Sequence, residues 1–314
     1  MMDFIRIPSN PVPKGAEVFD IDAADGAKLR AALFPVENAR GTVTLLNGRC
    51  EFIEKYFEVI EDLRKRGFSV ATMDWRGQGL SSRPLPVSEK GHINDFNTFK
   101  SDLRIFFEDI VKPRFPGPHI LMTHSMGGVP ALMLLADGYD EFQRAVLCAP
   151  MTRFFASARM RIYARTMAGV MCNIGASRLS VAGVKEYSLK FEGNVLTSDP
   201  ARHERFRELQ AAAPNACILA PTYGWLNAAI KAIDDIHDAE RLAKIDTPVL
   251  IISAENDFLV DSKDHSELAN ANAAVDCITV KGALHEILME RDEIRDQYWK
   301  AFDEFIAPVF AENS

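Results

Sequence analysis

Short apolar runs alternate along the chain with longer segments whose apolar residues recur every three or four positions. The short runs predict buried strands, and the longer spacing predicts helices with one face in the core. The predicted strands are residues 17–22, 28–35, 42–46, 68–73, 120–122, 144–149, 248–253 and 276–280. Between them we expect helices at 52–66, ended by Gly67, and at 96–111, ended before Pro113.

The order of these elements predicts an α/β fold. The first two strands form a hairpin around residues 24–26, and the later strands alternate with helices. Strand–helix–strand units connect parallel strands, so we expect a mostly parallel sheet. Ligand sites in such sheets lie at the carboxyl ends of the strands.

The alternation breaks between residues 150 and 238, where apolar and basic helical segments replace strands. We interpret this stretch as a helical cap inserted into a core of residues 1–149 and 239–314. Phe154, Phe155, Tyr223 and Trp225 of the insertion, with Asn47 of the core, are expected to line a substrate pocket. Most apolar cap residues are still needed to pack the cap on the core.

Composition narrows the function classes. The net charge of −8 disfavours nucleic acid as a partner. The five cysteines are scattered without metal-binding spacing, which favours free thiols in a reducing compartment and no metal. There is no signal-peptide pattern and no apolar run long enough for a membrane span, so we expect a cytoplasmic protein.

Ser125 is the candidate nucleophile. It lies where an apolar run meets an Ala- and Leu-rich helical segment, the pattern of a sharp strand-to-helix turn that exposes a serine hydroxyl. The helix N-terminus and the N–H group of Met126 could stabilise an oxyanion there. Thr123 replaces the first Gly of the usual Gly-x-Ser-x-Gly pattern. The alternative is that Ser125 only caps the helix.

Two later strand ends supply candidates for an acid and a base. Asp257 follows the strand at 248–253, and His285 follows the strand at 276–280. The order Ser, Asp, His is that of a hydrolase triad on an α/β sheet. Asp261 is the second choice for the acid and Glu255 the third.

Two other histidines receive structural interpretations. His124 adjoins Ser125 and is expected to point away from it, and His265 is expected to be solvated on a polar helix.

The sequence resembles the α/β-hydrolase superfamily, within it the lysophospholipase and monoacylglycerol lipase group, also described as serine aminopeptidase-like hydrolases. The resemblance covers about residues 15–308 and is carried by residues 47–49, the Asp-x-Arg-Gly-x-Gly-x-Ser motif at 74–81, residues 91–96, His-Ser-Met-Gly-Gly at 124–128, and residues 221–226, 256–257 and 282–286. It implies an α/β-hydrolase fold, with helices on both faces of a mostly parallel sheet and a helical cap.

The resemblance also implies roles for single residues. Ser125 is the nucleophile, Asp257 the acid and His285 the base, and the backbone N–H groups of Met126 and Arg49 hold the oxyanion. No metal or organic cofactor is implied. The family usually has His-Gly where this chain has Asn47 and Gly48, which changes how the loop is braced but removes no reacting group.

The resemblance implies a lipid-like monoester as substrate, either a lysophospholipid or a monoacylglycerol. Arg153, Arg159 and Arg161 could meet a phosphate head group or could simply be solvated. The alternatives are a short-chain carboxylesterase, an aminopeptidase-like hydrolase and a non-catalytic ligand-binding protein. An aminopeptidase would need acidic residues in the cap, where residues 151–195 hold few, such as Glu186 and Glu192. Transient contact with a membrane surface is compatible with such a substrate, and the oligomeric state stays open.

Overall fold

The structure is a computed structural model that describes residues 3–87, 89–182 and 190–311. Its strands are β1 (Glu17–Asp22), β2 (Lys28–Phe34), β3 (Gly41–Leu46), β4 (Phe68–Met73), β5 (His119–His124), β6 (Arg144–Cys148), β7 (Val249–Ala254) and β8 (Val275–Val280). Its α-helices are α1 (Phe57–Lys65), α2 (Asn97–Ile105), α3 (Lys112–Arg114), α4 (Gly128–Ala136), α5 (Ala158–Asn173), α6 (Pro200–Ala212), α7 (Tyr223–Ile236), α8 (Ala239–Leu242), α9 (Ser262–Ala271), α10 (Asp292–Ile306) and α11 (Pro308–Ala311).

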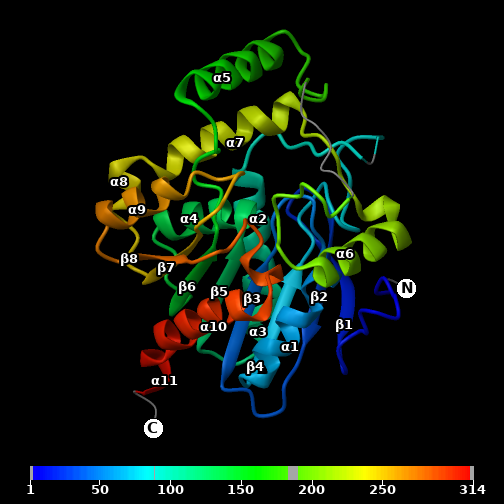
Figure 1. Cartoon of the computed structure of the whole chain (residues 1–314), viewed down its shortest axis with the longest axis vertical. Helices are drawn as coiled ribbons and strands as arrows, with labels where there is room; N and C mark the ends of the chain where they lie inside the picture. The colour runs from blue at the N-terminus through cyan, green and yellow to red at the C-terminus, as the bar shows by residue number, and fades with distance from the viewer. Residues whose placement is uncertain (1–2, 88, 183–189, 312–314) are drawn as a thin grey trace.

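The strands form one sheet in the order β1-β2-β4-β3-β5-β6-β7-β8. The β1–β2 and β2–β4 pairs are antiparallel, and every later pair is parallel. The carboxyl ends of β3 to β8 therefore meet at one edge, the upper edge in Figure 1. The predicted, mostly parallel sheet is confirmed, with strand ends that differ by a few residues at most.

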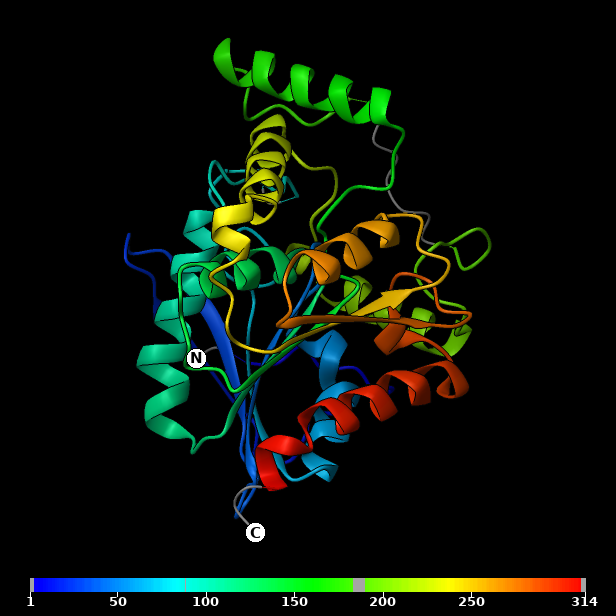
Figure 2. The same cartoon turned by 90° about the vertical axis from the view of Figure 1, so that its left-hand side faces the viewer.

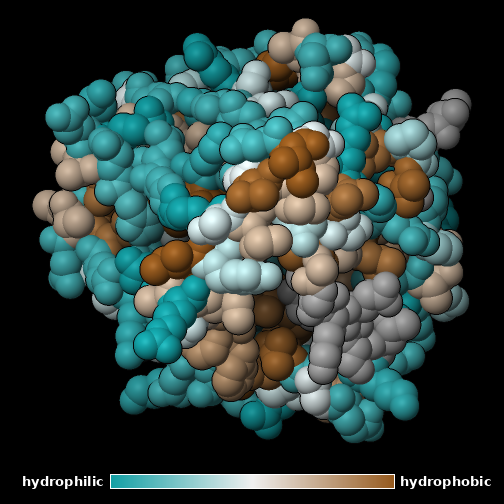
Figure 3. All heavy atoms as spheres, turned by 90° about the horizontal axis from the view of Figure 1, so that it is seen from above, coloured by the Kyte–Doolittle hydropathy of each residue, from teal (hydrophilic) through white to brown (hydrophobic). Residues whose placement is uncertain are grey.

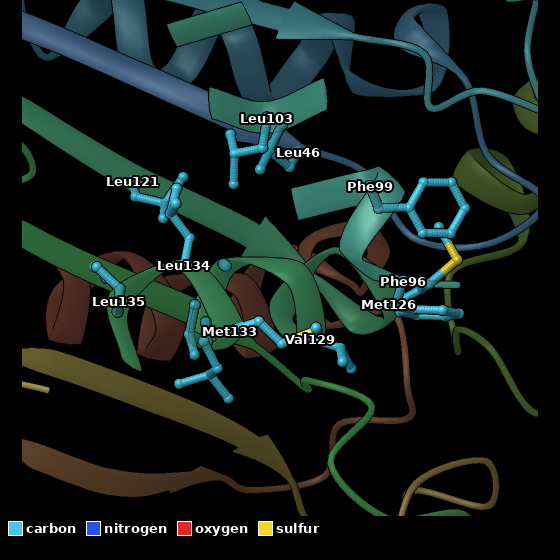
Figure 4. Close-up of a cluster of buried hydrophobic side chains, with 14 of the residues drawn as sticks. Leu46, Phe96, Phe99, Leu103, Leu121, Met126, Val129, Met133, Leu134 and Leu135 are labelled. Atoms are coloured by element: carbon cyan, nitrogen blue, oxygen red, sulfur yellow. The ribbon is translucent and has the colours of Figure 1, made fainter. Parts of the chain in front are cut away.

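Two hydrophobic clusters lie on the two faces of the sheet. One contains the buried sides of α1 and α10, and the other those of α2, α4 and α7. Figure 2 shows the sheet nearly edge-on between these helices. Figure 4 shows part of the second cluster, where α4 side chains such as Met133 and Leu134 lie close to Leu121 of the sheet. Because helices cover both faces of the sheet, the central strands are apolar on both sides.

Two predicted helices differ in detail from those observed. In the first of them, predicted at 52–66, a 3₁₀ turn (Ile53–Tyr56) precedes α1, which begins only at Phe57. The helix after Phe96 does not end before Pro113, since α2 continues through a π-helical segment, Phe106–Val111, into α3. Pro113 therefore lies in the last turn of this continuous helical stretch, which ends one residue later at Arg114.

Segment 150–238 runs between β6 and β7 and lies over the carboxyl ends of the strands. Helix α7 packs on α4, and α5 packs on α7, so α5 stands farthest from the sheet (Figures 1 and 2). Seen from above, apolar side chains gather near the middle of this face (Figure 3). The exposed large apolar side chains of α5 are Met160, Ile162, Tyr163 and Val170. Within the described residues no helix has the length and apolar character needed to cross a bilayer.

Glu58 on α1 binds segment 150–238 to the core. Its carboxylate accepts hydrogen bonds from Arg202 at 2.6 Å, from Arg205, and from Arg295 of α10 at 3.2 Å. Burial opposes ionisation, but the three guanidinium groups outweigh it and lower the pKa of Glu58 to about 2. The ionised carboxylate therefore stabilises the attachment of α6 to α1.

We expect Glu58→Gln to lower the free energy of unfolding by about 2 kcal/mol at pH 7, allowing for the partial exposure of the group. Because the folded-state pKa is depressed, this contribution is complete above about pH 4.5 and is lost as the pH falls toward 2. Urea unfolding at about pH 7 and pH 3.5 measures the difference. If the difference in unfolding free energy between wild type and Glu58→Gln stays constant or widens at the lower pH, the low pKa assigned to Glu58 is contradicted. Glu304→Gln, in an exposed pair with Lys300, is the neutral control.

Candidate active site

Ser125 lies at the sharp turn between β5 and α4. Its φ angle is +49°, a left-handed conformation that is uncommon for residues other than glycine. A Cβ atom on Gly127 would lie 2.7 Å from the carbonyl oxygen of Asn47, and one on Gly128 would lie 2.6 Å from Cβ of Pro150. The turn is therefore crowded on two sides, and the glycines are needed for close packing. This is the geometry of a nucleophile elbow.

Gly127→Ala should disturb this turn, because a backbone oxygen cannot move aside as a flexible side chain can. We expect it to lower kcat for ester hydrolysis at least about tenfold and to destabilise the fold by about 1–3 kcal/mol. Gly169→Ala on α5 is the matched control, since its Cβ would meet no atom within 4 Å. The control should be neutral or slightly stabilising. Esterase rates and thermal unfolding of both variants measure this, and equal effects would count against a crowded elbow.

His285 and Asp257 lie beside Ser125 as the sequence order predicts. His285 Nε2 is 2.9 Å from Ser125 Oγ, and His285 Nδ1 is 2.6 Å from an Asp257 carboxylate oxygen. The other Asp257 oxygen accepts hydrogen bonds from the N–H groups of Leu259 and Val260. Burial opposes ionisation of Asp257, but His285 and these N–H groups outweigh it and lower its pKa. Asp257 is thus held as a carboxylate that can orient His285.

The alternative acids have other partners. The Asp261 carboxylate accepts a hydrogen bond from the N–H of Lys263 at the start of α9, and Glu255 accepts one from the N–H of Gly282. The expectation that His265 is solvated was wrong. Its ring is fully buried, 2.6 Å from Ser253 Oγ and 2.8 Å from the carbonyl oxygen of Pro150, so it joins β7 to the start of segment 150–238.

The loop after β3 contacts Ser125. A Cβ atom on Gly48 would lie 3.1 Å from Ser125 Cβ, which places the backbone of residues 48 and 49 against the turn. The Met126 side chain is fully buried beside Phe96 (Figure 4), which fixes its backbone next to Ser125. Both predicted oxyanion donors, the N–H groups of Arg49 and Met126, thus belong to segments that adjoin Ser125.

Asn47 braces this loop from behind. Its side-chain amide donates to the carbonyl oxygen of Met73 at 3.2 Å, and its own carbonyl oxygen accepts from the Trp75 indole at 2.9 Å. Gln78 donates to the Asn47 side chain and to the carbonyl oxygen of Gly48. Asn47 is 1% exposed and does not line the cavity beside Ser125, so the structure places it behind the loop and not in the pocket where it was expected.

A buried charge network supports the same loop. Glu51 accepts hydrogen bonds from the N–H of Gly48, from the Tyr56 hydroxyl and from Lys55. His124 Nδ1 lies 3.1 Å from Glu51, so His124 points away from Ser125, as expected. Burial alone would raise the pKa of Glu51, but Lys55 and His124 hold it well below its ordinary value. An ionised Glu51 therefore fixes the loop that carries the Arg49 N–H.

A family model described as serine aminopeptidase, S33, matches residues 37–292. The chain belongs to this family. Lysophospholipase L2 of Escherichia coli is 29% identical over 299 residues, covering 91% of this chain and 86% of that protein. The probable lysophospholipase L2 of Haemophilus influenzae is 28% identical over 278 residues, covering 88% and 87%.

Solved structures agree with this assignment of the fold. A soluble variant of monoglyceride lipase from Saccharomyces cerevisiae superposes with a TM-score of 0.74 and 21% identity, over 93% of this chain and 96% of that one. The α/β-hydrolase fold and the resemblance to lysophospholipases and monoacylglycerol lipases are confirmed. Together with the relatives, this finding supports an ester-hydrolysing serine hydrolase.

A cavity of about 380 Å³ lies beside Ser125 and His285. Phe154 and Trp225 line it, as expected from the sequence. The structure places Phe155 and Tyr223 elsewhere: Phe155 is exposed and packs on Phe258, and the Tyr223 hydroxyl accepts a hydrogen bond from the N–H of Ala182.

One wall of the cavity was not predicted from the sequence. Helix α6 contributes Arg202, His203, Phe206, Arg207 and Gln210. Their spacing of one helical turn is visible in the sequence, but spacing alone does not show what that side of the helix faces. Within the described ranges, no group of three or more His, Cys, Asp or Glu side chains is placed to hold a metal ion.

The arginines considered for a phosphate head group lie away from this cavity. Arg153 is paired with Asp264 and Glu267 near α9, and Arg161 lies near Asp261. Arg159 is exposed. A polar head group in the cavity would instead meet α6.

Proposed function

We propose that the chain hydrolyses the carboxylic ester of a single-chain lipid, a lysophospholipid or a monoacylglycerol, through a Ser125–His285–Asp257 triad. The observation that carries the proposal is the hydrogen-bonded series Ser125 Oγ, His285 and Asp257 beside a cavity large enough for part of an acyl chain. The names of the Escherichia coli and Haemophilus influenzae relatives support this substrate class.

The proposed reaction begins with proton transfer from Ser125 to His285 Nε2 as Oγ attacks the ester carbonyl. Asp257, bonded to Nδ1, stabilises the imidazolium that forms. The N–H groups of Met126 and Arg49 donate to the oxyanion. The alcohol then leaves with the proton from His285, and water repeats the sequence on the acyl-enzyme to release the fatty acid.

Segment 150–238 is proposed to act as the cap over this site. Its helices α6 and α7 supply cavity residues, among them Phe206 and Trp225. The Arg202–Glu58 pair attaches α6 to α1. A cap of this kind shields the reacting ester from water and defines the shape of the acyl pocket.

The carboxylates in the cavity favour an ester over an aminopeptidase substrate. An aminopeptidase needs an unpaired carboxylate to hold the substrate ammonium group. Glu51 and Glu286 line the cavity, yet each lies 2.6 Å from the buried ammonium group of Lys55. Glu192 is not among the cavity residues, and Glu186 lies outside the described residues.

A panel of substrates tests the proposal. It contains p-nitrophenyl esters from acetate to palmitate, lysophosphatidylcholine, monooleoylglycerol and an alanine anilide, with Ser125→Ala as the blank. Hydrolysis of the single-chain lipids and the long-chain esters supports the proposed substrate class. If activity is highest on the acetate or butyrate ester, the chain is instead a short-chain carboxylesterase. Turnover of the anilide alone, or of no substrate by a folded protein, overturns the proposal.

We also propose a cytoplasmic location and transient contact with a lipid surface. The free state of all five cysteines supports a reducing compartment. Exposed side chains such as Ile162 and Val170 on α5 support contact with a bilayer surface. Co-sedimentation with phospholipid vesicles tests the contact, which should weaken in Ile162→Ser and would be refuted if the wild type stays in the supernatant.

A further inference from the structure

Helix α6 presents a polar face to the cavity. His203, Arg207 and Gln210 lie three or four residues apart, and all three line the cavity beside Ser125. Residues at this spacing share one side of a helix. The guanidinium of Arg207 donates to the side-chain oxygen of Gln210, a neutral partner, and no carboxylate within the described part of the chain pairs with it. The face therefore holds an arginine whose charge is not neutralised.

Two other arginines border the same cavity. Arg202 is fully engaged, because it binds Glu58, Asp199 and Asp292. Arg49 differs: its guanidinium donates to the carbonyl oxygen of Leu219 and lies 5.2 Å from the ring centre of Trp225. Among the residues described, Arg49 has no carboxylate partner. Among the described residues, the cavity thus has two cations, Arg49 and Arg207, that are not paired with a carboxylate.

The two carboxylates of the cavity do not provide that balance. Glu51 and Glu286 share Lys55, and Glu51 also lies 3.1 Å from His124. Burial opposes charge on His124, but Glu51 raises its pKa, so positive charge gathers around these carboxylates. Lys55 and His124 thus compensate the negative charge of Glu51 and Glu286. The uncompensated charge on the α6 side of the cavity is positive.

Two buried nitrogen atoms at the cavity lack partners. His203 is 8% exposed and packs against Phe191, and its Nδ1 has no hydrogen-bond partner in the described structure. The Nε of Arg49 is buried and unpaired in the same way. Both atoms also have almost no accessible surface, so a molecule in the cavity meets other atoms of these two side chains.

Another part of the cavity wall is apolar. Met151, Phe154, Leu226, Leu259 and Val260 line it from the end of β6, from α7 and from the loop before α9. These apolar side chains and the polar side chains of α6 thus come from different elements, and in Figure 1 α6 lies on the right of the view and α9 on the left. An elongated molecule with one charged and one apolar end matches this division.

Resting on the proposed ester hydrolysis, we infer that Arg207, His203 and Gln210 bind the phosphate diester of a lysophospholipid head group while the acyl chain lies on the apolar wall. Guanidinium groups suit phosphate oxygens, and the Gln210 amide N–H₂ and a His203 N–H add donors. A monoacylglycerol carries no charge for Arg207 to bind. The chain therefore prefers lysophospholipids to monoacylglycerols of equal acyl length.

The test compares two substrates that share an acyl chain, 1-oleoyl lysophosphatidylcholine and 1-oleoylglycerol. Arg207→Met should lower kcat/KM for the lysophospholipid about 10- to 100-fold and change it less than about threefold for the glyceride. Arg205→Met is the matched control on the same helix, since Arg205 binds Glu58 and does not line the cavity. It should affect both substrates alike.

Glycerophosphocholine, which keeps the head group but has no acyl chain, provides a second readout. It should inhibit p-nitrophenyl butyrate hydrolysis by the wild type more strongly than inorganic phosphate does, and Arg207→Met should abolish the inhibition. Equal losses on both oleoyl substrates, or unchanged inhibition in the variant, would overturn the head-group site. A wild type that hydrolyses only the glyceride would overturn it and leave the ester hydrolysis intact. If no ester is hydrolysed, the proposed function fails, and calorimetric binding of glycerophosphocholine still decides the subsite.

Discussion

Replacing Ser125 with alanine is expected to lower kcat for ester hydrolysis at least about 10⁴-fold while the protein stays folded. The hydroxyl is the only group of the proposed triad that forms a covalent bond, so its loss removes the acyl-enzyme route completely. Ser125 already has a Cβ atom at φ +49°, so alanine adds no new strain. Stopped assays with p-nitrophenyl butyrate measure kcat, and circular dichroism with thermal unfolding measures folding.

A pair of aspartates provides the control for this prediction. Asp257→Asn keeps the shape but removes the charge that faces His285 at 2.6 Å, so we expect kcat to fall by about 10³- to 10⁴-fold. Asp261→Asn changes a carboxylate that only caps α9 and should leave kcat within about twofold. More than about 1% residual activity in Ser125→Ala, or equal losses in the two aspartate variants, would refute the assignment of roles.

The order of strands along the chain explains why so much of this site was predictable. Ser125, Asp257 and His285 each follow an apolar strand, and parallel strands bring their carboxyl ends to one edge. The βαβ topology therefore brings together Ser125 and His285, which are 160 residues apart in sequence and 2.9 Å apart in space, and Asp257 and His285, which are 28 residues apart and 2.6 Å apart in space.

Side chains whose surroundings come from distant segments were less predictable. His265 lies on a helix with a polar sequence, yet it is fully buried because Ser253 and the Pro150 carbonyl group supply partners from two other elements. The arginines of α6 are a second example. Local sequence records which residues are charged, but only the packing of α6 over the strand ends shows that Arg207 faces a cavity.

The Asp-x-Arg-Gly-x-Gly-x-Ser motif shows how a family signal can serve structure and not chemistry. Asp74 accepts hydrogen bonds from the N–H groups of Ile53 and Leu80 and is completely buried. A Cβ atom on Gly79 would lie 2.1 Å from the Asp74 carboxyl carbon, so only glycine fits there. The motif joins the loops after β3 and β4, and the first of these carries the proposed Arg49 donor.

Arg30→Met is expected to lower the free energy of unfolding by about 3–5 kcal/mol, the largest stability effect we predict. Arg30 is completely buried and donates to Glu54 at 3.1 Å and to Asp74 at 3.2 Å. Methionine fills similar space but leaves two buried carboxylates without a cation. Lys28→Met is the control on the same strand, because its pair with Asp22 is exposed and should contribute no more than about 1 kcal/mol.

Two further measurements identify the cause of that loss. Arg30→Lys keeps the charge but not the forked geometry, so guanidinium-induced unfolding should place it between the wild type and Arg30→Met, even if the methionine variant proves too unstable to purify. The loss of unfolding free energy in either variant should also become smaller as the pH falls from about 7 to 5. Burial raises the pKa of Asp74, and the protonated carboxyl group needs no cation beside it. A deficit independent of pH would mean that Arg30 acts through packing against Phe4, at 5.7 Å, and not through charge.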